Sequence, residues 1–118
     1  MSAFKTYKGG RLDLEHYKGK TISSYEFSLY NDDDTEFDLS NYSDIRIKIY
    51  QKIHGTLVLS FDFQSGILTD SPVGNTVYWN ATKEQMNIRP KLYWHECYGI
   101  RTTTTREDLL FEGISEVI

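Results

Sequence analysis

DIRIKIYQKIHGTLVLSFDF, from Asp44 to Phe63, is the stretch of the chain that decides its fold. Apolar and polar residues alternate in both halves of this stretch. The apolar set falls at odd positions and comprises Ile45, Ile47, Ile49, Leu57, Leu59, Phe61 and Phe63. Successive side chains of a strand point to opposite faces, so this period of two predicts two strands that each bury one face.

The break between the two strands predicts how they pair. Odd-numbered residues face odd-numbered residues only if the loop has an odd length, and Ile53-His54-Gly55 supplies three residues. Gly55 stands where a three-residue hairpin needs a left-handed conformation. A two-residue turn would place Ile49 beside Ser60 and divide the apolar face, so the pattern disfavours it.

Shorter patterns on either side predict further strands and their turns. Residues 12–17, 21–30, 76–80, 92–100 and 109–118 alternate in the same way, and 38–40 and 67–69 form short extended pieces. Ser65-Gly66 and residues 101–108 predict turns, and Gly113 indicates a bulge. Thr82 and Gln85 fit a capping box ahead of Pro90, which predicts one short helical turn near 82–88 with Met86 or Ile88 in the core.

These elements predict an all-β fold, an antiparallel immunoglobulin-like β-sandwich of seven to eight strands. The Tyr93-x-His95-x-Cys97 start of a strand after a helical turn is similar to the tyrosine corner of immunoglobulin-like domains. In that corner the tyrosine hydroxyl bonds to backbone just upstream. The second Cys and the core Trp of antibody domains are not in place.

Length and composition predict one domain of residues 11–118 behind a flexible arm of residues 1–10. A net charge of −4 argues against nucleic acid as a partner. No apolar run approaches a membrane span of ~20 residues, and the N-terminus lacks the apolar stretch of a secretory signal. A single cysteine, Cys97, rules out an internal disulfide and fits synthesis in a reducing cytoplasm.

Two groups of residues suggest metal ligands, and each has a simpler interpretation. The acidic stretch at residues 31–38 could gather oxygens for Ca²⁺, but it lacks the Gly and terminal Glu of a calcium loop and is typical of a solvated turn. His95 and Cys97 share one strand face and could bind zinc. His16 and His54 show no spacing that supplies further ligands, so packed core residues are the favoured interpretation. We expect no metal and no cofactor.

Catalysis has little support in the sequence. Cys97 would need a group that stabilises its thiolate, and no glycine-rich nucleophile elbow is present. Carboxylates occur singly on predicted strand faces, at Asp13, Glu15, Glu26, Asp62 and Glu96. We therefore expect that the protein is not an enzyme.

The outward positions of the predicted strands carry cations and aromatic rings. Exposed Tyr and Trp are what protein interfaces use, although a row of Lys and Arg also fits the solvated side of a strand, with Lys protecting a sheet edge. The interface candidates are Arg46, Lys48, Tyr50, Lys52, Tyr78, Trp94 and Tyr98.

The order of short motifs resembles small immunoglobulin-like domains of tailed-bacteriophage virions. The motifs are the polar turn and Asp-Leu-Ser step within residues 29–40, Gly55, Gly66, Val77-Tyr78-Trp79, Thr82-x-x-Gln85, Leu92-Tyr93 and Gly113-x-x-x-Val117. The nearest likeness is to the N-terminal domain of phage upper baseplate proteins, over roughly residues 20–118. Lys91-Leu92-Tyr93 departs from that pattern, in which Gly precedes the Tyr, and no receptor-binding or coiled-coil segment follows.

This resemblance implies a virion structural or assembly protein of the tail, baseplate, fibre adaptor or head surface. Such a protein is made in the host cytoplasm, becomes part of the virion, and contacts other virion proteins and further copies of itself. The alternative is a carbohydrate-binding module for host-surface recognition, in which Tyr50, Tyr78, Trp94 and Tyr98 stack on sugars.

Overall fold

The computed structural model describes residues 3–62 and 74–118, and these residues form nine strands and no helix. The predicted turn at Ser65-Gly66 and the extended piece at 67–69 lie outside the described residues. The strands are β1 (Ala3–Tyr7), β2 (Gly10–Arg11), β3 (Leu14–His16), β4 (Ile22–Tyr30), β5 (Tyr42–Tyr50), β6 (Leu57–Phe61), β7 (Thr76–Ala81), β8 (Lys91–Arg101) and β9 (Glu107–Val117).

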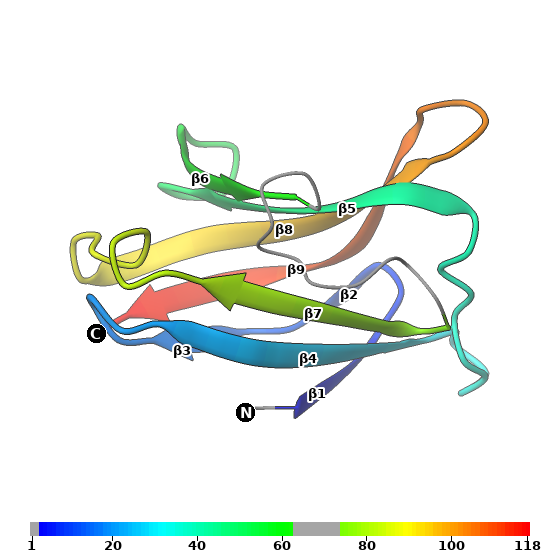
Figure 1. Cartoon of the computed structure of the whole chain (residues 1–118), viewed down its shortest axis with the longest axis horizontal. Coiled ribbons are helices and arrows are strands. Elements are labelled where there is room, and N and C mark those ends of the chain that lie inside the picture. The colour runs from blue at the N-terminus through cyan, green and yellow to red at the C-terminus, as the bar shows by residue number, and fades with distance from the viewer. Residues whose placement is uncertain (1–2, 63–73) are drawn as a thin grey trace.

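Two sheets pack face to face as a β-sandwich (Figure 1). The small sheet has the order β1-β4-β7, and the large sheet has the order β2-β9-β8-β5-β6, with β3 also pairing with β9. The prediction of a β-sandwich is confirmed, but both sheets are mixed rather than antiparallel. Strand β1 runs parallel to β4, and β2 and β3 run parallel to β9.

The N-terminal segment forms those parallel pairs, so residues Ala3–Tyr7 differ from the flexible arm that the sequence suggested. Phe4 stacks on Phe27 with ring centroids 5.5 Å apart, and Thr6 is buried. The chain then crosses to the large sheet, where the Gly9 N–H donates to the Leu110 carbonyl at 2.7 Å. One short edge segment thus borders both sheets, which protects their edges.

The core lies between the sheets and contains the alternating residues of β5. Ile45, Ile47 and Ile49 are fully buried. Ile47 pairs with Phe61 and Ile49 with Leu59, so odd positions face odd positions as predicted. Trp79 of β7 is the largest fully buried side chain and packs against Phe61 with ring centroids 5.2 Å apart.

The connection between β5 and β6 differs from the prediction in two respects. The left-handed residue is His54, with φ of 59°, and not Gly55. Gly55 instead provides space, because a Cβ atom there would lie 2.9 Å from the Lys52 carbonyl oxygen. A register shift at Ile49/Tyr50 pairs Leu57 with Tyr50, so Leu57 turns to the outward side and is 48% exposed, whereas the alternation predicted it to be buried.

The helical turn expected near 82–88 is a single turn, and no helix follows it. The capping-box hydrogen bonds do form, from the Thr82 N–H to Gln85 Oε1 at 2.8 Å and from the Gln85 N–H to Thr82 Oγ1 at 3.2 Å. A helix has no room to develop, since β8 begins at Lys91. Met86 is fully buried and Ile88 packs against the core.

The contact expected of a tyrosine corner is confirmed. The Tyr93 hydroxyl donates to the Arg89 carbonyl oxygen at 2.6 Å, four residues upstream. This bond ties the start of β8 to the turn that precedes it.

Tyr93→Phe should lower the free energy of unfolding by about 1 kcal/mol, because it removes this hydrogen bond and leaves the ring in place. Urea denaturation measures the loss. Tyr17→Phe is the matched control, since that ring is exposed and its hydroxyl makes a long bond of 3.3 Å to Glu15. An equal loss in both variants would contradict the role given to the corner.

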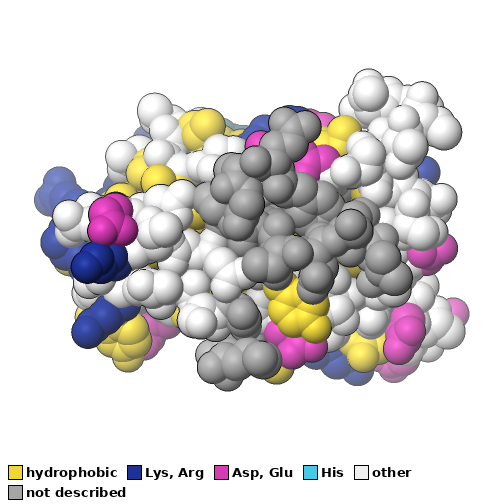
Figure 2. Space-filling model, in the orientation of Figure 1, with side chains coloured by type: hydrophobic (Ala, Val, Ile, Leu, Met, Phe, Trp, Pro, Cys, Tyr) yellow, Lys and Arg dark blue, Asp and Glu magenta, His cyan; other side chains and the backbone are white. Residues whose placement is uncertain are grey.

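Charged side chains are unevenly placed along the sandwich. The connections at 17–21 and 82–90 meet at one end, where the Gly19 N–H donates to the Met86 carbonyl at 2.9 Å. Figure 2 shows Lys and Arg side chains gathered at that end. The exposed basic residues of these two connections are Lys18, Lys20, Lys83 and Arg89.

Candidate functional site

The outward side of the large sheet brings most of the predicted interface residues together. Alternate residues of β5 and β8, such as Ile47 and Cys97, point into the core, so their neighbours point outward. We call this surface the outer face. It comprises Arg46, Lys48, Tyr50, Trp94, Glu96, Tyr98, Leu109, Glu112 and Ile114.

Five of the seven candidates from the sequence lie on the outer face. Arg46 is opposite Tyr98, Tyr50 is opposite Trp94, and Lys48 is opposite Glu96 across the β5–β8 pair. The other two candidates lie elsewhere. Lys52 is exposed in the connection between β5 and β6. Tyr78 lies on β7 in the small sheet, opposite Glu26.

Glu96 lies at the centre of the outer face, although the sequence indicated it only as one scattered carboxylate. Its Oε1 accepts a hydrogen bond from the Tyr98 hydroxyl at 2.7 Å, and its Oε2 accepts from Trp94 Nε1 at 3.2 Å. Positions 94, 96 and 98 share a face by their spacing of two, which is the signal that could have identified the group. Burial and the hydrogen bond to Glu96 raise the pKa of Tyr98, and burial and the Glu96 charge raise the pKa of Tyr50.

Charges on the outer face are sorted by strand. On β5, Lys48 Nζ lies 5.6 Å from the centre of the Tyr98 ring and 4.0 Å from Glu107 Oε1. Arg46 bonds to Asp44 at 3.2 Å. Strand β9 carries Glu107, Glu112 and Glu116. We call the cations of β5 the basic strip and the carboxylates of β9 the acidic strip. They lie on either side of β8, and Glu107 joins them at one end, 3.9 Å from Arg46 Nη1 and 4.0 Å from Lys48 Nζ.

A shallow pocket of about 390 Å³ opens at the β5–β6 side of the outer face. Its lining combines two rings, a carboxylate and an imidazole, from Tyr50, His54, Gly55, Glu96 and Tyr98. A depression of similar size, about 410 Å³, lies beside the start of β4 and the end of β7, and no aromatic ring lines it. Rings beside a carboxylate make the first pocket the better ligand site.

His95, considered for zinc together with Cys97, forms a buried hydrogen-bonded chain with Ser115 and His16. His95 Nε2 lies 2.7 Å from the Leu12 carbonyl oxygen, which only accepts, so Nε2 carries the proton. The Ser115 hydroxyl then donates to His95 Nδ1 at 2.6 Å and accepts from His16 Nε2 at 3.1 Å. These directions hold for neutral rings, and burial lowers the pKa of each imidazole to about 4, so both are neutral at pH 7 and donate through Nε2.

The structure gives Cys97 a position in the core. Its side chain is fully buried between the sheets, and burial raises the pKa of the thiol. Both ring nitrogens of His95 are occupied by Ser115 and Leu12. Within residues 3–62 and 74–118, no group of three or more His, Cys, Asp or Glu side chains is placed to hold a metal ion.

The acidic stretch considered for calcium is a turn held by its own side chains. Asp33 Oδ1 accepts from the Thr35 hydroxyl at 2.6 Å and from the Thr35 N–H at 3.1 Å, which lowers the pKa of Asp33. Asp34 adopts a left-handed conformation with φ of 66° and accepts from the Tyr7 hydroxyl at 2.6 Å. The turn is thereby fastened to β1.

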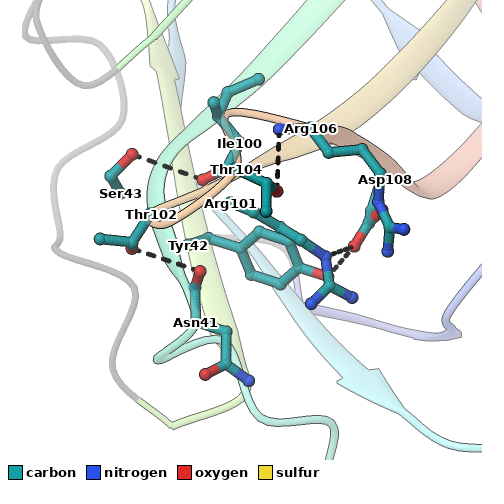
Figure 3. A network of polar contacts seen from close by, with 9 residues as sticks. All are labelled: Asn41, Tyr42, Ser43, Ile100, Arg101, Thr102, Thr104, Arg106 and Asp108. Carbon is teal, nitrogen blue, oxygen red and sulfur yellow. Dashed lines mark hydrogen bonds and ion pairs between the residues drawn. The ribbon is translucent and has the colours of Figure 1, made fainter.

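A second polar network holds the β8–β9 turn (Figure 3). Asp108 Oδ2 accepts from the Tyr42 hydroxyl at 2.8 Å and from Arg101 Nε at 2.6 Å, and Oδ1 accepts from Arg106 Nε at 3.1 Å. Burial acts to raise the pKa of Asp108, but the hydrogen bonds from Tyr42 and Arg101 outweigh it and hold the pKa below its usual value. Burial and the bond to Asp108 raise the pKa of Tyr42 to about 12.

Asp108→Asn should lower the free energy of unfolding by about 1–2 kcal/mol. The amide keeps only one accepting oxygen, so its NH2 faces either Arg106 or the Tyr42–Arg101 pair, and the charge that pairs with Arg101 is lost. Thermal and urea denaturation measure the change. Asp32→Asn, in the exposed 31–38 turn, is the control and should stay near wild type. A neutral effect of Asp108→Asn would show that the network adds nothing to the hairpin.

No helix in the part of the chain that the structure describes is long and apolar enough to cross a membrane. No protein-family model and no curated protein sequence matches the chain.

Proposed function

We propose that the chain is a structural or assembly module that acts through protein–protein contacts, with the outer face of the large sheet as its contact surface. The observation that carries this proposal is the convergence of Tyr50, Trp94 and Tyr98 on one sheet face between two charged strips. Protein interfaces have this composition, with aromatic residues at the centre and charged residues at the rim.

The proposal includes an immunoglobulin-like topology and a place among tailed-phage virion proteins, as a tail, baseplate, fibre-adaptor or head-surface component. The topology is supported by the order β9-β8-β5-β6 opposite β4-β7, by the parallel pairing of the N-terminal segment with the last strand, and by the Tyr93 corner. Strand β1 departs from it by running parallel to β4. The virion role is supported by the motifs between Leu29 and Val117 that resemble such domains.

Co-expression with the products of the neighbouring genes, followed by quantitative binding, tests the proposed function. Tyr50→Ala/Tyr98→Ala should weaken binding by about 10-fold or more, since buried aromatic anchors dominate interface energies. Tyr78→Ala removes the candidate ring that lies on the small sheet and should leave binding unchanged. The opposite result, with loss in Tyr78→Ala alone, would move the contact surface to the small sheet.

Binding of a neutral saccharide is a second candidate, and the pocket beside Glu96 favours it. Tyr50 and Tyr98 supply ring surface, and the Glu96 carboxylate keeps lone pairs beyond the two that Tyr98 and Trp94 use. Titration with glucose, galactose and N-acetylglucosamine, followed by tryptophan fluorescence and amide NMR shifts, tests it. Shifts confined to the pocket and lost in Glu96→Gln support the site, whereas no shift at ~50 mM sugar removes it.

A further inference from the structure

We propose that the partner of the outer face is a second copy of this chain, related by a twofold axis that runs parallel to β8. The inference rests on the proposed function, because it names the occupant of the same surface. The supporting observation is the arrangement of charge across the strands, because a twofold axis parallel to β8 places basic β5 of one copy opposite acidic β9 of the other.

One row across the large sheet shows the pattern. Arg11 of β2 is opposite Glu112 of β9, Glu112 is opposite Glu96 of β8, and Glu96 is opposite Lys48 of β5. A twofold axis above β8 and parallel to it exchanges the positions of β5 and β9 and keeps every row at its height. Lys48 of each copy then faces Glu112 of the other copy, so the contact occurs twice.

The alternative axis within the interface runs across the strands, and charge disfavours it. That operation lays β5 over β5, so that Arg46 and Lys48 face the same cations of the other copy. It also lays acidic β9 over β9. Like charges opposite each other disfavour the axis that runs across the strands. With the axis parallel to β8, opposite charges face each other and fix how the two copies are aligned.

The apolar residues of the outer face fit the same axis. Ile114, Trp94 and Tyr50 form one row, in which Trp94 is opposite Ile114 on one side and Tyr50 on the other. The twofold operation sets each Tyr50 over Ile114 of the other copy. It also brings the two Trp94 rings together near the axis, each with the Arg11 guanidinium of its own chain 5.8 Å from the ring centre. Leu57 and Leu92, which are 48% and 57% exposed, border this row. The result is an aromatic centre between charged strips.

Glu96 opposes this association. It lies on β8 near the axis, so the two Glu96 carboxylates approach each other when the copies meet. The hydrogen bonds from Tyr98 and Trp94 disperse part of each charge, and Lys48 lies in the same row. Replacing Glu96 by the neutral Gln should therefore strengthen the dimer, a result that a merely structural role for Glu96 does not predict.

The size of the surface sets the expected affinity. The surface spans the four neighbouring strands β9, β8, β5 and β6. With strands ~4.8 Å apart and a rise of ~3.3 Å per residue, about eight residues of each strand cover roughly 500 Å². Stable interfaces cover about 800 Å² per partner, so the pair belongs at the weak end. We expect a dimer with a dissociation constant between about 10 µM and 1 mM. Added salt should weaken it, because salt screens exposed ion pairs.

Sedimentation velocity over that concentration range tests the proposal with a charge exchange. Lys48→Glu and Glu112→Lys should each weaken the dimer by about 10-fold, because each places like charges opposite one another twice. The double variant Lys48→Glu/Glu112→Lys restores opposite charges and should return to within about threefold of wild type, and Glu96→Gln should bind more tightly. Glu26→Lys makes the same charge change on the small sheet and should have no effect, and urea denaturation checks that each variant is folded.

A wild-type chain that stays monomeric at about 1 mM overturns the proposal, as does a double variant that is no tighter than either single variant. Either result leaves the proposed function standing if Tyr50→Ala/Tyr98→Ala still weakens binding to a co-expressed protein. If Tyr50→Ala/Tyr98→Ala also left binding to co-expressed proteins unchanged, both the dimer and the proposed contact surface would be excluded.

Discussion

Gly113→Ala is expected to destabilise the fold by about 2–4 kcal/mol, through overpacking and the loss of hydrogen bonds. A Cβ atom at position 113 would collide with the Leu12 carbonyl oxygen and lie 2.8 Å from Asp13 Oδ1. Neither atom can move freely. The Leu12 carbonyl accepts from His95 Nε2 at 2.7 Å, and Asp13 Oδ1 accepts from the Ile114 N–H at 2.9 Å. Relief of the collision would therefore break bonds that hold the β2–β3 connection to His95 of β8 and Ile114 of β9.

Urea denaturation of the wild type and the variant measures this cost. Gly19→Ala is the matched control, because Gly19 has φ of +68° and no atom within 4 Å of its Cβ position. It should lose only about 1 kcal/mol, from left-handed strain alone. If the two variants lost equal amounts, the close approach of Leu12 to Gly113 would not be a constraint on the fold.

The second large effect is a loss of stability as the pH falls from 6.5 towards 4. Burial lowers the pKa of His16 and of His95 from 6.5 to about 4. In that interval the unfolded chain binds protons that the folded chain does not, so the free energy of unfolding decreases with falling pH. The stabilisation is complete above 6.5. One pKa unit corresponds to about 1.4 kcal/mol, so each histidine contributes up to about 3 kcal/mol.

Urea denaturation at pH 7.5, 5.5 and 4.5 measures the slope, and NMR titration of the imidazole protons assigns it to individual histidines. His54→Gln alters the histidine of the exposed β5–β6 turn and should keep the slope of the wild type. A free energy of unfolding that is constant from pH 7.5 to 4.5 would contradict the neutral His16–Ser115–His95 chain.

The features that the sequence predicted correctly depend on local patterns. The alternation predicted the buried face of β5 and the odd-to-odd pairing of Ile47 with Phe61 and Ile49 with Leu59, but not the exposed position of Leu57. The Tyr93 corner is a contact over four residues and was equally accessible. Five of the interface candidates lie on one sheet face because a period of two places neighbours at alternate positions on the same side, and their role in an interface stays a prediction.

The features that the sequence missed depend on partners far along the chain. Strand β3 pairs with β9 about one hundred residues later, and no local pattern in Leu14–His16 specifies that pairing. The sequence indicates a bulge at Gly113, whereas the register shift lies at Cys97/Tyr98 and Gly113 makes room for Leu12. The capping box at Thr82 was real, but the nearby start of β8 limited it to one turn.

Hydroxyl-radical footprinting is the measurement that tests most directly whether the outer face is the contact surface. It compares the isolated chain at low concentration with the chain in the assembly that it forms with further copies or with co-expressed neighbours. The account predicts that protection on assembly is concentrated at Tyr50, Trp94 and Tyr98, while Tyr78 stays reactive. Unchanged reactivity of those three rings in a formed assembly, with protection on the small sheet instead, would contradict it.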